Sequence, residues 1–238
     1  MEPKYKRVLL KLSGESLAGE AGHGIDFDTA QKIVAPVKTL IENGVQVAIV
    51  VGGGNFWRGR SSGEMERTRA DKMGMLATVI NSLGLQEILE QLGLEVKVMS
   101  ALCMDQVAET FVRDNAVRYL EEGKVVIFAA GTGMPFFSTD TGAALRAAEI
   151  NADVILKATM VDGVYDSDPK KNPDAKKYNH IQYLKVLQDN LQVMDMTAAS
   201  FCNDRKIKFY VFSIEDPENI IRVVDGEDIG TTIDWLAD

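Results

Sequence analysis

The chain has 238 residues, of which 46% are hydrophobic and 26% charged, so it is long enough to bury a sizeable core. Its net charge of −9 argues against nucleic-acid binding through a basic surface, and no apolar run approaches the roughly 20 residues of a membrane helix. The first residues are too charged and too soon followed by a strand for a secretory signal, so we expect a cytoplasmic protein. Its two cysteines and two histidines disfavour metal sites and hydrolase triads.

Short apolar runs alternate with helical patterns along the chain. Nearly continuous hydrophobicity predicts strands buried on both faces at 8–12, 45–51, 96–99, 125–130, 154–156 and 208–212. Helices are predicted from Asp28 to Asn43 and at about 67–92, 106–122, 141–151, 184–190, 197–206 and 217–224. This alternation predicts an α/β fold with an open, mostly parallel sheet and helices on both faces.

Three local features qualify these assignments. Asp28 and Gln31 have the spacing of a capping box, and Pro36 predicts a kink or a late start of that helix. Gly74 and Gly84 weaken the prediction of an unbroken helix over 67–92. The charged segment 162–178 lacks apolar periodicity, which predicts a hairpin, a lid or a solvated loop.

Ligands of open parallel sheets bind beyond the carboxyl ends of the strands, so we consider the residues that follow each predicted strand. Lys11 lies within the first strand, where a buried ammonium needs an anion, and Ser13-Gly14 lets backbone amides approach that anion. The alternative is an edge-strand lysine whose ammonium lies in solvent. Gly52, Gly53 and Gly54 follow the second strand with Arg58 nearby, which favours a phosphate-binding turn.

Two later strand ends have similar residues. Gly131-Thr132-Gly133 precedes Ser138, Thr139 and Asp140 at a predicted helix start, where an anion or a simple helix cap is favoured. Lys157 follows another strand. Tyr165 and Asp168 could line a purine and ribose pocket, although Asp-Gly and Asp-Pro are also common in turns.

Together these strand ends contain two lysines, an arginine, glycine-rich turns and Asp140. This inventory is typical of phosphoryl transfer, which needs charge neutralisation and alignment and no covalent nucleophile. The sequence has no P-loop, no dinucleotide fingerprint and no protein-kinase motif set. We therefore predict a kinase that binds nucleotide by another route.

Five segments occur in an order that resembles the amino acid kinase family and, within it, the bacterial uridylate kinases. They are "KLSGES", "GGGNFWRG", "ADKMGMLATVIN", "GTGMPFFSTD" and "KATMVDGVYDSDP". The resemblance spans essentially the whole chain. It implies a single domain over 1–238, a three-layer α/β/α fold, and transfer of the γ-phosphate of Mg-ATP to UMP in pyrimidine nucleotide biosynthesis.

The resemblance also implies roles for individual residues. The implied catalytic residues are Lys11, Asp140 and Lys157. The implied ATP-binding residues are Lys11, Leu12, Ser13, Gly14, Gly54, Arg58, Thr159, Tyr165 and Asp168. The implied UMP-binding residues are Gly53, Asp71, Thr132, Gly133, Met134, Pro135, Phe136, Phe137, Ser138 and Thr139. Mg²⁺ is expected to arrive with ATP, without a metal site of the protein's own.

Some expectations depart from this pattern or leave alternatives open. Members of the family often have a polar residue where this chain has Met134, and Asp71 could instead be a surface charge on a helix. The family implies a homohexamer that GTP activates and UTP inhibits. An oligomer face or plain core packing would explain the apolar stripe Met73, Met75, Leu76, Val79, Ile80 and Leu83.

The acceptor side is expected mainly in the N-terminal part and the ATP nucleoside side in 157–238. The rivals are a kinase of a carboxylate or carbamate, and a nucleotide- or oxyanion-binding protein without catalysis.

Overall fold

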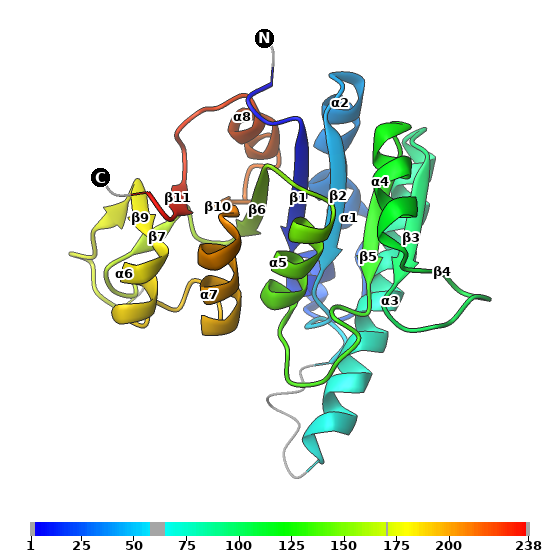
Figure 1. The fold of residues 1–238 in the computed structure, drawn as a ribbon, viewed down its shortest axis with the longest axis horizontal. Coiled ribbons are helices and arrows are strands. Elements are labelled where there is room, and N and C mark those ends of the chain that lie inside the picture. The colour runs from blue at the N-terminus through cyan, green and yellow to red at the C-terminus, as the bar shows by residue number, and fades with distance from the viewer. Residues whose placement is uncertain (1–2, 58–64, 170, 237–238) are drawn as a thin grey trace.

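The computed structural model describes residues 3–57, 65–169 and 171–236. Its centre is a nine-stranded sheet with the strand order β4-β3-β5-β2-β1-β6-β10-β11-β9 (Figure 1). The strands are β1 (Arg7–Leu12), β2 (Gln46–Val51), β3 (Val96–Ser100), β4 (Glu109–Thr110), β5 (Val125–Ala129), β6 (Val154–Thr159), β9 (His180–Gln182), β10 (Lys208–Ser213) and β11 (Thr231–Asp234). The pairing of β10 with β11 is antiparallel and the other pairings in the sheet are parallel.

β1 lies near the middle of the sheet, between β2 and β6. The chain fills one side of β1 first, with β2 to β5, and then crosses to the other side with β6 and the strands after it. The connections that follow β1 and β6 therefore leave the sheet next to each other. A parallel sheet of this kind binds ligands where the strand order reverses, which places the expected site beyond the carboxyl ends of β1, β2 and β6.

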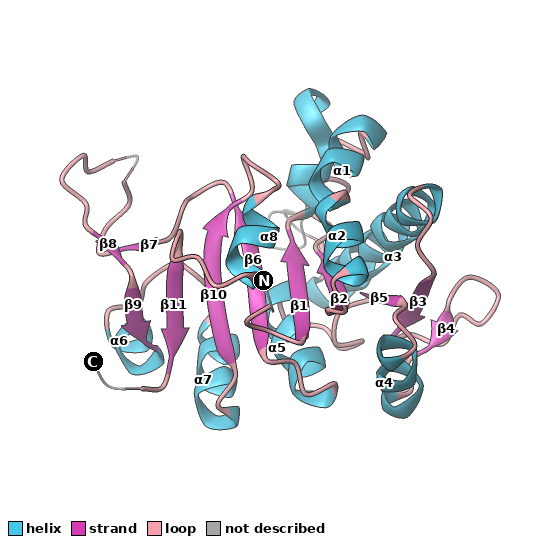
Figure 2. Ribbon diagram, turned by 90° about the horizontal axis from the view of Figure 1, so that it is seen from above, coloured by secondary structure: helices cyan, strands magenta, loops and turns pink. Residues whose placement is uncertain are grey.

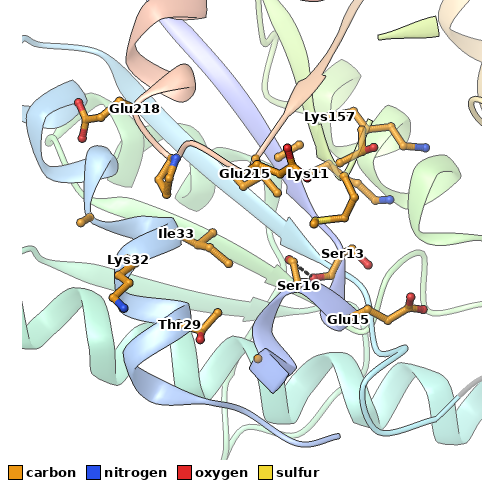
Figure 3. Close-up of a pocket in the computed structure, with 17 residues that line it drawn as sticks. Lys11, Ser13, Glu15, Ser16, Thr29, Lys32, Ile33, Lys157, Glu215 and Glu218 are labelled. Carbon is orange, nitrogen blue, oxygen red and sulfur yellow. Dashed lines mark hydrogen bonds between the residues drawn. The ribbon is translucent and has the colours of Figure 1, made fainter. Parts of the chain in front are cut away.

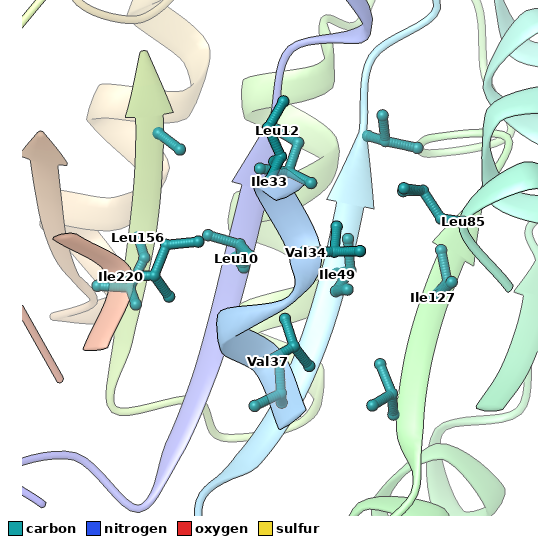
Figure 4. Packing of buried hydrophobic residues seen from close by; sticks show 14 of the residues in the cluster. Leu10, Leu12, Ile33, Val34, Val37, Ile49, Leu85, Ile127, Leu156 and Ile220 are labelled. Carbon is teal, nitrogen blue, oxygen red and sulfur yellow. The ribbon is translucent and has the colours of Figure 1, made fainter. Parts of the chain in front are cut away.

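Helices cover both faces of the sheet, as expected (Figure 2). The first layer contains α1 (Phe27–Val34), α2 (Pro36–Glu42), α3 (Arg67–Gln91) and α8 (Asn219–Val224). The second contains α4 (Arg113–Glu121), α5 (Thr139–Glu149), α6 (Tyr183–Gln188) and α7 (Met196–Arg205). Successive β1 side chains point to opposite layers. Leu10 and Leu12 pack with α1 (Figure 4), whereas Leu9 packs with α5 on the other face of the sheet.

The first predicted helix is two helices that meet at Pro36. α1 ends at Val34 and α2 begins at Pro36, where a missing N–H costs nothing because the first turn has no acceptor for it. The capping box predicted from Asp28 is wrong. The carboxylate of Asp26 accepts from the Thr29 N–H instead, and α1 begins one residue before Asp28.

α3 runs unbroken through Gly74 and Gly84. A Cβ at Gly84 would lie 2.6 Å from Cδ1 of Ile25, so glycine lets the segment before α1 pack directly on this helix. The helix predicted over 106–122 begins only at Arg113, because the preceding residues form a turn and the edge strand β4. The short strands β4, β9 and β11 were not predicted, and each has four residues or fewer.

The charged excursion predicted at 162–178 contains a hairpin. β7 (Val164–Tyr165) pairs antiparallel with β8 (Lys177–Tyr178), and this hairpin forms a sheet of its own. Within the part of the chain that the structure describes, no helix combines the length and apolar character that a membrane crossing requires.

Candidate active site

Two lysines lie side by side at the carboxyl edge of the sheet. Lys11 of β1 and Lys157 of β6 are paired in register on neighbouring parallel strands. Their ammonium groups contact the two oxygens of one carboxylate, that of Asp140, at 2.9 Å for Lys11 and 2.7 Å for Lys157. The three side chains are only 12–13% exposed. The cost of burying each charge is thus offset by a close opposite charge. Lys11 is therefore not an edge-strand lysine with its ammonium group in solvent, because β1 lies between β2 and β6.

The protonation of Asp140 follows from this contact. Burial by itself raises the pKa of a carboxyl group, but the charges of Lys11 and Lys157 outweigh it and lower the pKa of Asp140 to about 2. At neutral pH Asp140 is therefore an anion that orients two cations, and it is a poor proton acceptor. Burial also lowers the pKa of Lys157, although Asp140 opposes this shift.

Asp140 is held by the first turn of α5. The hydroxyl of Ser138 caps this helix by accepting from the N–H groups of Asp140 and Thr141. The same hydroxyl donates to the carboxylate of Asp195, which also accepts from the Thr141 hydroxyl at 3.0 Å. Asp195 in turn caps α7 by accepting from Ala198 N–H. One carboxylate thus joins the amino ends of two helices behind the lysines.

The glycine turns after β1 and β2 pack against each other. A Cβ at Gly14 would lie 2.4 Å from the carbonyl oxygen of Gly52. A Cβ at Gly53 would lie 2.8 Å from both the Ala77 Cβ and the Gly74 carbonyl oxygen of α3. Only glycine fits at these two positions, so the close approach is enforced by sterics.

A cavity of about 430 Å³ opens between the β2 turn, α3 and the loop after β5. The residues predicted for UMP that line it are Gly53, Asp71, Thr132, Met134, Phe137, Ser138 and Thr139. The remaining three, Gly133, Pro135 and Phe136, are not part of its lining. Gly54, which was predicted to bind ATP, also lines this cavity.

Asp71 is not a free surface charge. Its side chain is 12% exposed and accepts from Nε of Arg67 at 2.8 Å. It also accepts from the N–H of Phe136 at 2.8 Å. Asp71 therefore joins α3 to the loop after β5 across the mouth of the 430 Å³ cavity.

A second cavity, of about 570 Å³, lies beneath the hairpin on the other side of Lys157. Thr159, Tyr165 and Asp168, which were predicted for the ATP nucleoside, line it together with Leu191 and Val193. The Lys157 ammonium also donates to the Val193 carbonyl group, which connects this cavity to the charged cluster.

Two other residues predicted to bind ATP are not among the described residues that line these cavities. Leu12 has its side chain in the core, and its carbonyl group accepts from the Gly52 N–H at 3.0 Å. Arg58 lies outside the described residues.

The largest of the three cavities, about 960 Å³, was predicted only in part, because Lys11, Ser13, Lys157 and Thr159 were expected in the site but the rest of its lining was not. Lys11, Ser13 and Lys157 lie at one end, and Lys32 of α1 and Glu218 near α8 lie toward the other (Figure 3). The residues of α1 and those just before α8 that line it have no local sign of ligand binding, so no pattern in the sequence assigned them to a site.

Lys11 and Lys157 line the 960 Å³ cavity, and Lys157 also lines the 570 Å³ cavity. The 430 Å³ cavity is lined by Ser138 and Thr139, which directly precede Asp140 in the chain. A sequence profile described as "Amino acid kinase family" matches residues 6–213. The chain belongs to this family.

Solved structures of UMP or uridylate kinases resemble the chain over nearly its whole length. A UMP kinase from Bacillus anthracis is 40% identical, with a TM-score of 0.94 over 98% of this chain and 97% of its own. A UMP kinase from Ureaplasma parvum is 39% identical, with a TM-score of 0.91 over 97% of this chain and 99% of its own. A uridylate kinase from Archaeoglobus fulgidus is 30% identical, with a TM-score of 0.72 over 95% of this chain and 99% of its own. The three-layer α/β/α architecture expected from the resemblance is therefore confirmed.

Proposed function

We propose that this amino acid kinase family member transfers the γ-phosphate of ATP to UMP, giving ADP and UDP. The observation that carries the proposal is the Lys11–Asp140–Lys157 cluster. Lys157 lines the 570 Å³ cavity, and Ser138 and Thr139, which directly precede Asp140 in the chain, line the 430 Å³ cavity. The identity of the acceptor is supported by the three UMP or uridylate kinases that the chain resembles.

The charges of the cluster suit the transition state. Negative charge spreads over the oxygens of the moving phosphoryl group, so two fixed ammonium groups stabilise it without reorganising during the reaction. Asp140 holds those ammonium groups in place and stays ionised because its pKa is lowered to about 2. The acceptor phosphate of UMP is already an anion at neutral pH, so the transfer requires no strong base.

We assign the two substrates to different cavities within one domain over 1–238. UMP occupies the 430 Å³ cavity in the N-terminal part, with Gly53 near its phosphate and Asp71 near its ribose. The nucleoside of ATP occupies the 570 Å³ cavity, formed largely by 157–238, with Tyr165 and Asp168. The ATP phosphates then extend past Lys157 toward Lys11 and the Ser13-Gly14 turn.

Mg²⁺ is proposed to enter with ATP. The described residues contain no group of three or more His, Cys, Asp or Glu side chains that could hold a metal ion. Mg²⁺ in kinases is held by substrate phosphates, waters and one or two carboxylates, so the residues present fit an ion carried by ATP. The bound ion supplies further charge neutralisation on the phosphates.

The proposed reaction is tested by measuring ADP release from Mg-ATP with UMP, CMP, dUMP, GMP and acetylglutamate as separate acceptors. Turnover confined largely to UMP is the expected result. Turnover with acetylglutamate would instead support a carboxylate kinase, and failure of every acceptor would support a nucleotide-binding protein without catalysis.

Replacement of Asp71 by alanine is expected to raise the KM for UMP about 10- to 100-fold, the effect of losing a hydrogen bond to a charged group. The KM for ATP should change little, because Asp71 lies away from the 570 Å³ cavity. Steady-state kinetics with each substrate varied in turn measure both constants. Asp204→Ala on the exposed side of α7 is the matched control, and an unchanged KM for UMP in Asp71→Ala would remove this residue from the acceptor site.

We also propose that the chain forms a homohexamer in which α3 packs against a second copy. The predicted apolar stripe divides in the structure, because Met75 and Val79 are buried in the core. Met73, Leu76, Ile80 and Leu83 are exposed by 36–50% on the same helix. Their spacing of three and four residues forms one continuous face, which is typical of helix pairing.

The double variant Leu76→Glu, Ile80→Glu is expected to reduce the solution mass measured by light scattering, because it places charge on this face. The control is Gln86→Glu, Glu87→Gln, which leaves the apolar face intact and lies on the same helix. A hexameric mass for Leu76→Glu, Ile80→Glu would exclude the exposed α3 face from the interface.

The resemblance supports a cytoplasmic enzyme of pyrimidine nucleotide biosynthesis that GTP activates and UTP inhibits. UTP shares its uridine with UMP, so the 430 Å³ cavity is the proposed place of inhibition. Initial rates at fixed ATP, with UMP varied and either GTP or UTP added, test both effects.

A further inference from the structure

Two buried asparagines, Asn55 and Asn81, have no role in the site described above. Asn55 follows the glycine turn after β2, and Asn81 lies in α3. Their exposed fractions are 2% and 0%. A buried amide is unfavourable unless its donors and acceptors are paired, so the partners of these two side chains explain their presence.

The two side chains bind each other in both directions. Nδ2 of Asn55 donates to Oδ1 of Asn81 at 2.9 Å, and Nδ2 of Asn81 donates to Oδ1 of Asn55 at 2.7 Å. Each amide group also has one bond to the backbone. Asn81 donates to the Gly52 carbonyl group at 2.7 Å, and Asn55 donates to the Gly24 carbonyl group at 2.6 Å.

The pair lies directly behind the contact between the two glycine turns. A Cβ at Gly14 would lie 2.5 Å from Oδ1 of Asn55, almost as close as it would lie to the Gly52 carbonyl oxygen. The asparagines therefore connect α3 and the β2 turn by short hydrogen bonds, and Asn55 is in tight steric contact with the β1 turn. The Gly22–Gly24 segment is held to the same point, because the Gly24 N–H donates to the Asn55 carbonyl group at 3.2 Å.

The backbone that the pair holds is the part of the turn proposed to face phosphate. Among residues 3–57, 65–169 and 171–236, none accepts a hydrogen bond from the N–H of Gly53 or Gly54. The carbonyl group of Gly52 belongs to the same peptide unit as the Gly53 N–H. A bond that fixes this carbonyl group also fixes the direction of the Gly53 N–H, because the peptide unit is planar.

We propose that Asn55 and Asn81 are a positioning pair that sets the acceptor phosphate turn at Gly53 against the donor phosphate turn at Gly14. This inference rests on the proposed function, since it concerns how UMP is placed relative to ATP. Phosphoryl transfer depends on alignment of the two phosphates, and a misplacement of about 1 Å costs on the order of 100-fold in rate.

The test compares Asn55→Ser, Asn81→Ser and the double variant by kcat, by the KM for each substrate and by Tm. We expect each single change to lower kcat about 10- to 100-fold at a temperature well below its Tm, with a smaller change in the KM for ATP. The double variant should lose little more than either single variant, because both break the same pair.

Ser82→Ala is the matched control. Ser82 is also fully buried in α3, but its hydroxyl donates at 2.8 Å to the Thr78 carbonyl group of the same helix and reaches neither turn. We expect this variant to lower Tm while keeping kcat within twofold of the wild-type value. Asn81→Asp, which keeps the side-chain volume and removes the donor to Gly52, replaces Asn81→Ser if the serine variant does not fold.

Two results would overturn the inference, and they are distinguishable from each other. If the asparagine variants show a lower Tm but keep kcat within twofold, the pair only stabilises the fold. If the wild-type protein makes no UDP from UMP in the same assay, the proposed function fails, and the positioning role fails with it.

Discussion

Replacement of Lys11 by alanine is expected to lower kcat for UMP phosphorylation at least about 1,000-fold, the scale seen when a cation that stabilises transferring phosphoryl charge is lost. The affinity for ATP should fall much less, because the nucleoside is proposed to bind in the 570 Å³ cavity, which Lys11 does not line. Lys11 is thus predicted to stabilise the transition state more than the ground state.

Single-turnover rates and equilibrium binding of ATP separate these two effects. Lys208→Ala is a suitable control, because Lys208 is also a strand lysine but lies at the first position of β10, at the opposite edge of the sheet from the site. Near-normal turnover by Lys11→Ala would exclude the lysine cluster as the catalytic centre, whatever the substrate.

Replacement of Asp140 by asparagine is expected to lower kcat by about 100-fold or more, because two preorganised cations lose the anion that orients them. The pH dependence provides a sharper signature. Attraction to Asp140 raises the pKa of Lys157 against the larger effect of burial, so its loss should lower the pKa of Lys157 further. The alkaline limb of the kcat profile should therefore move to lower pH in Asp140→Asn.

At acid pH the ionisation of Asp140 is expected to affect the stability of the protein. The pKa of Asp140 is lowered from 3.8 to about 2, so its contribution to stability is present above about pH 4 and is lost as pH falls toward 2. The wild-type protein should therefore lose more stability than Asp140→Asn over this interval, as measured by Tm at each pH. Parallel losses, or an alkaline limb that does not move, would contradict the assigned coupling of the three charges.

Much of the site could be predicted from the sequence because its parts are local. Gly52 to Gly54, Lys11 and Lys157 each lie at the end of an apolar run, and buried strands and their ends have a clear hydrophobic pattern. Ser138 likewise has the sequence context of a helix cap, and the structure shows it as the cap of α5. These features depend on a few neighbouring residues, so the chain specifies them without reference to the rest of the fold.

Other local predictions failed where neighbouring residues favoured two different structures equally well. Asp26 and Asp28 are both acidic residues at the start of the same helix, and Asp26 is the cap because the helix begins at Phe27. The helix predicted from residue 106 begins seven residues later, where the edge strand β4 takes the intervening segment. Pairing with β3 decides this outcome, and no periodicity within the segment shows it.

The sequence by itself determined the class of fold and the chemical inventory of the site, because both follow from burial patterns and residue types within short segments. Only the tertiary structure decided that Lys11 and Lys157 are in register, that Asp140 lies between their ammonium groups, and that Asp195 joins two helix ends behind them. It also decided that Asn55 binds Asn81 and that α1 and the residues just before α8 wall the 960 Å³ cavity. Each of these contacts joins segments that are distant in the chain, and their distances depend on strand register and helix packing.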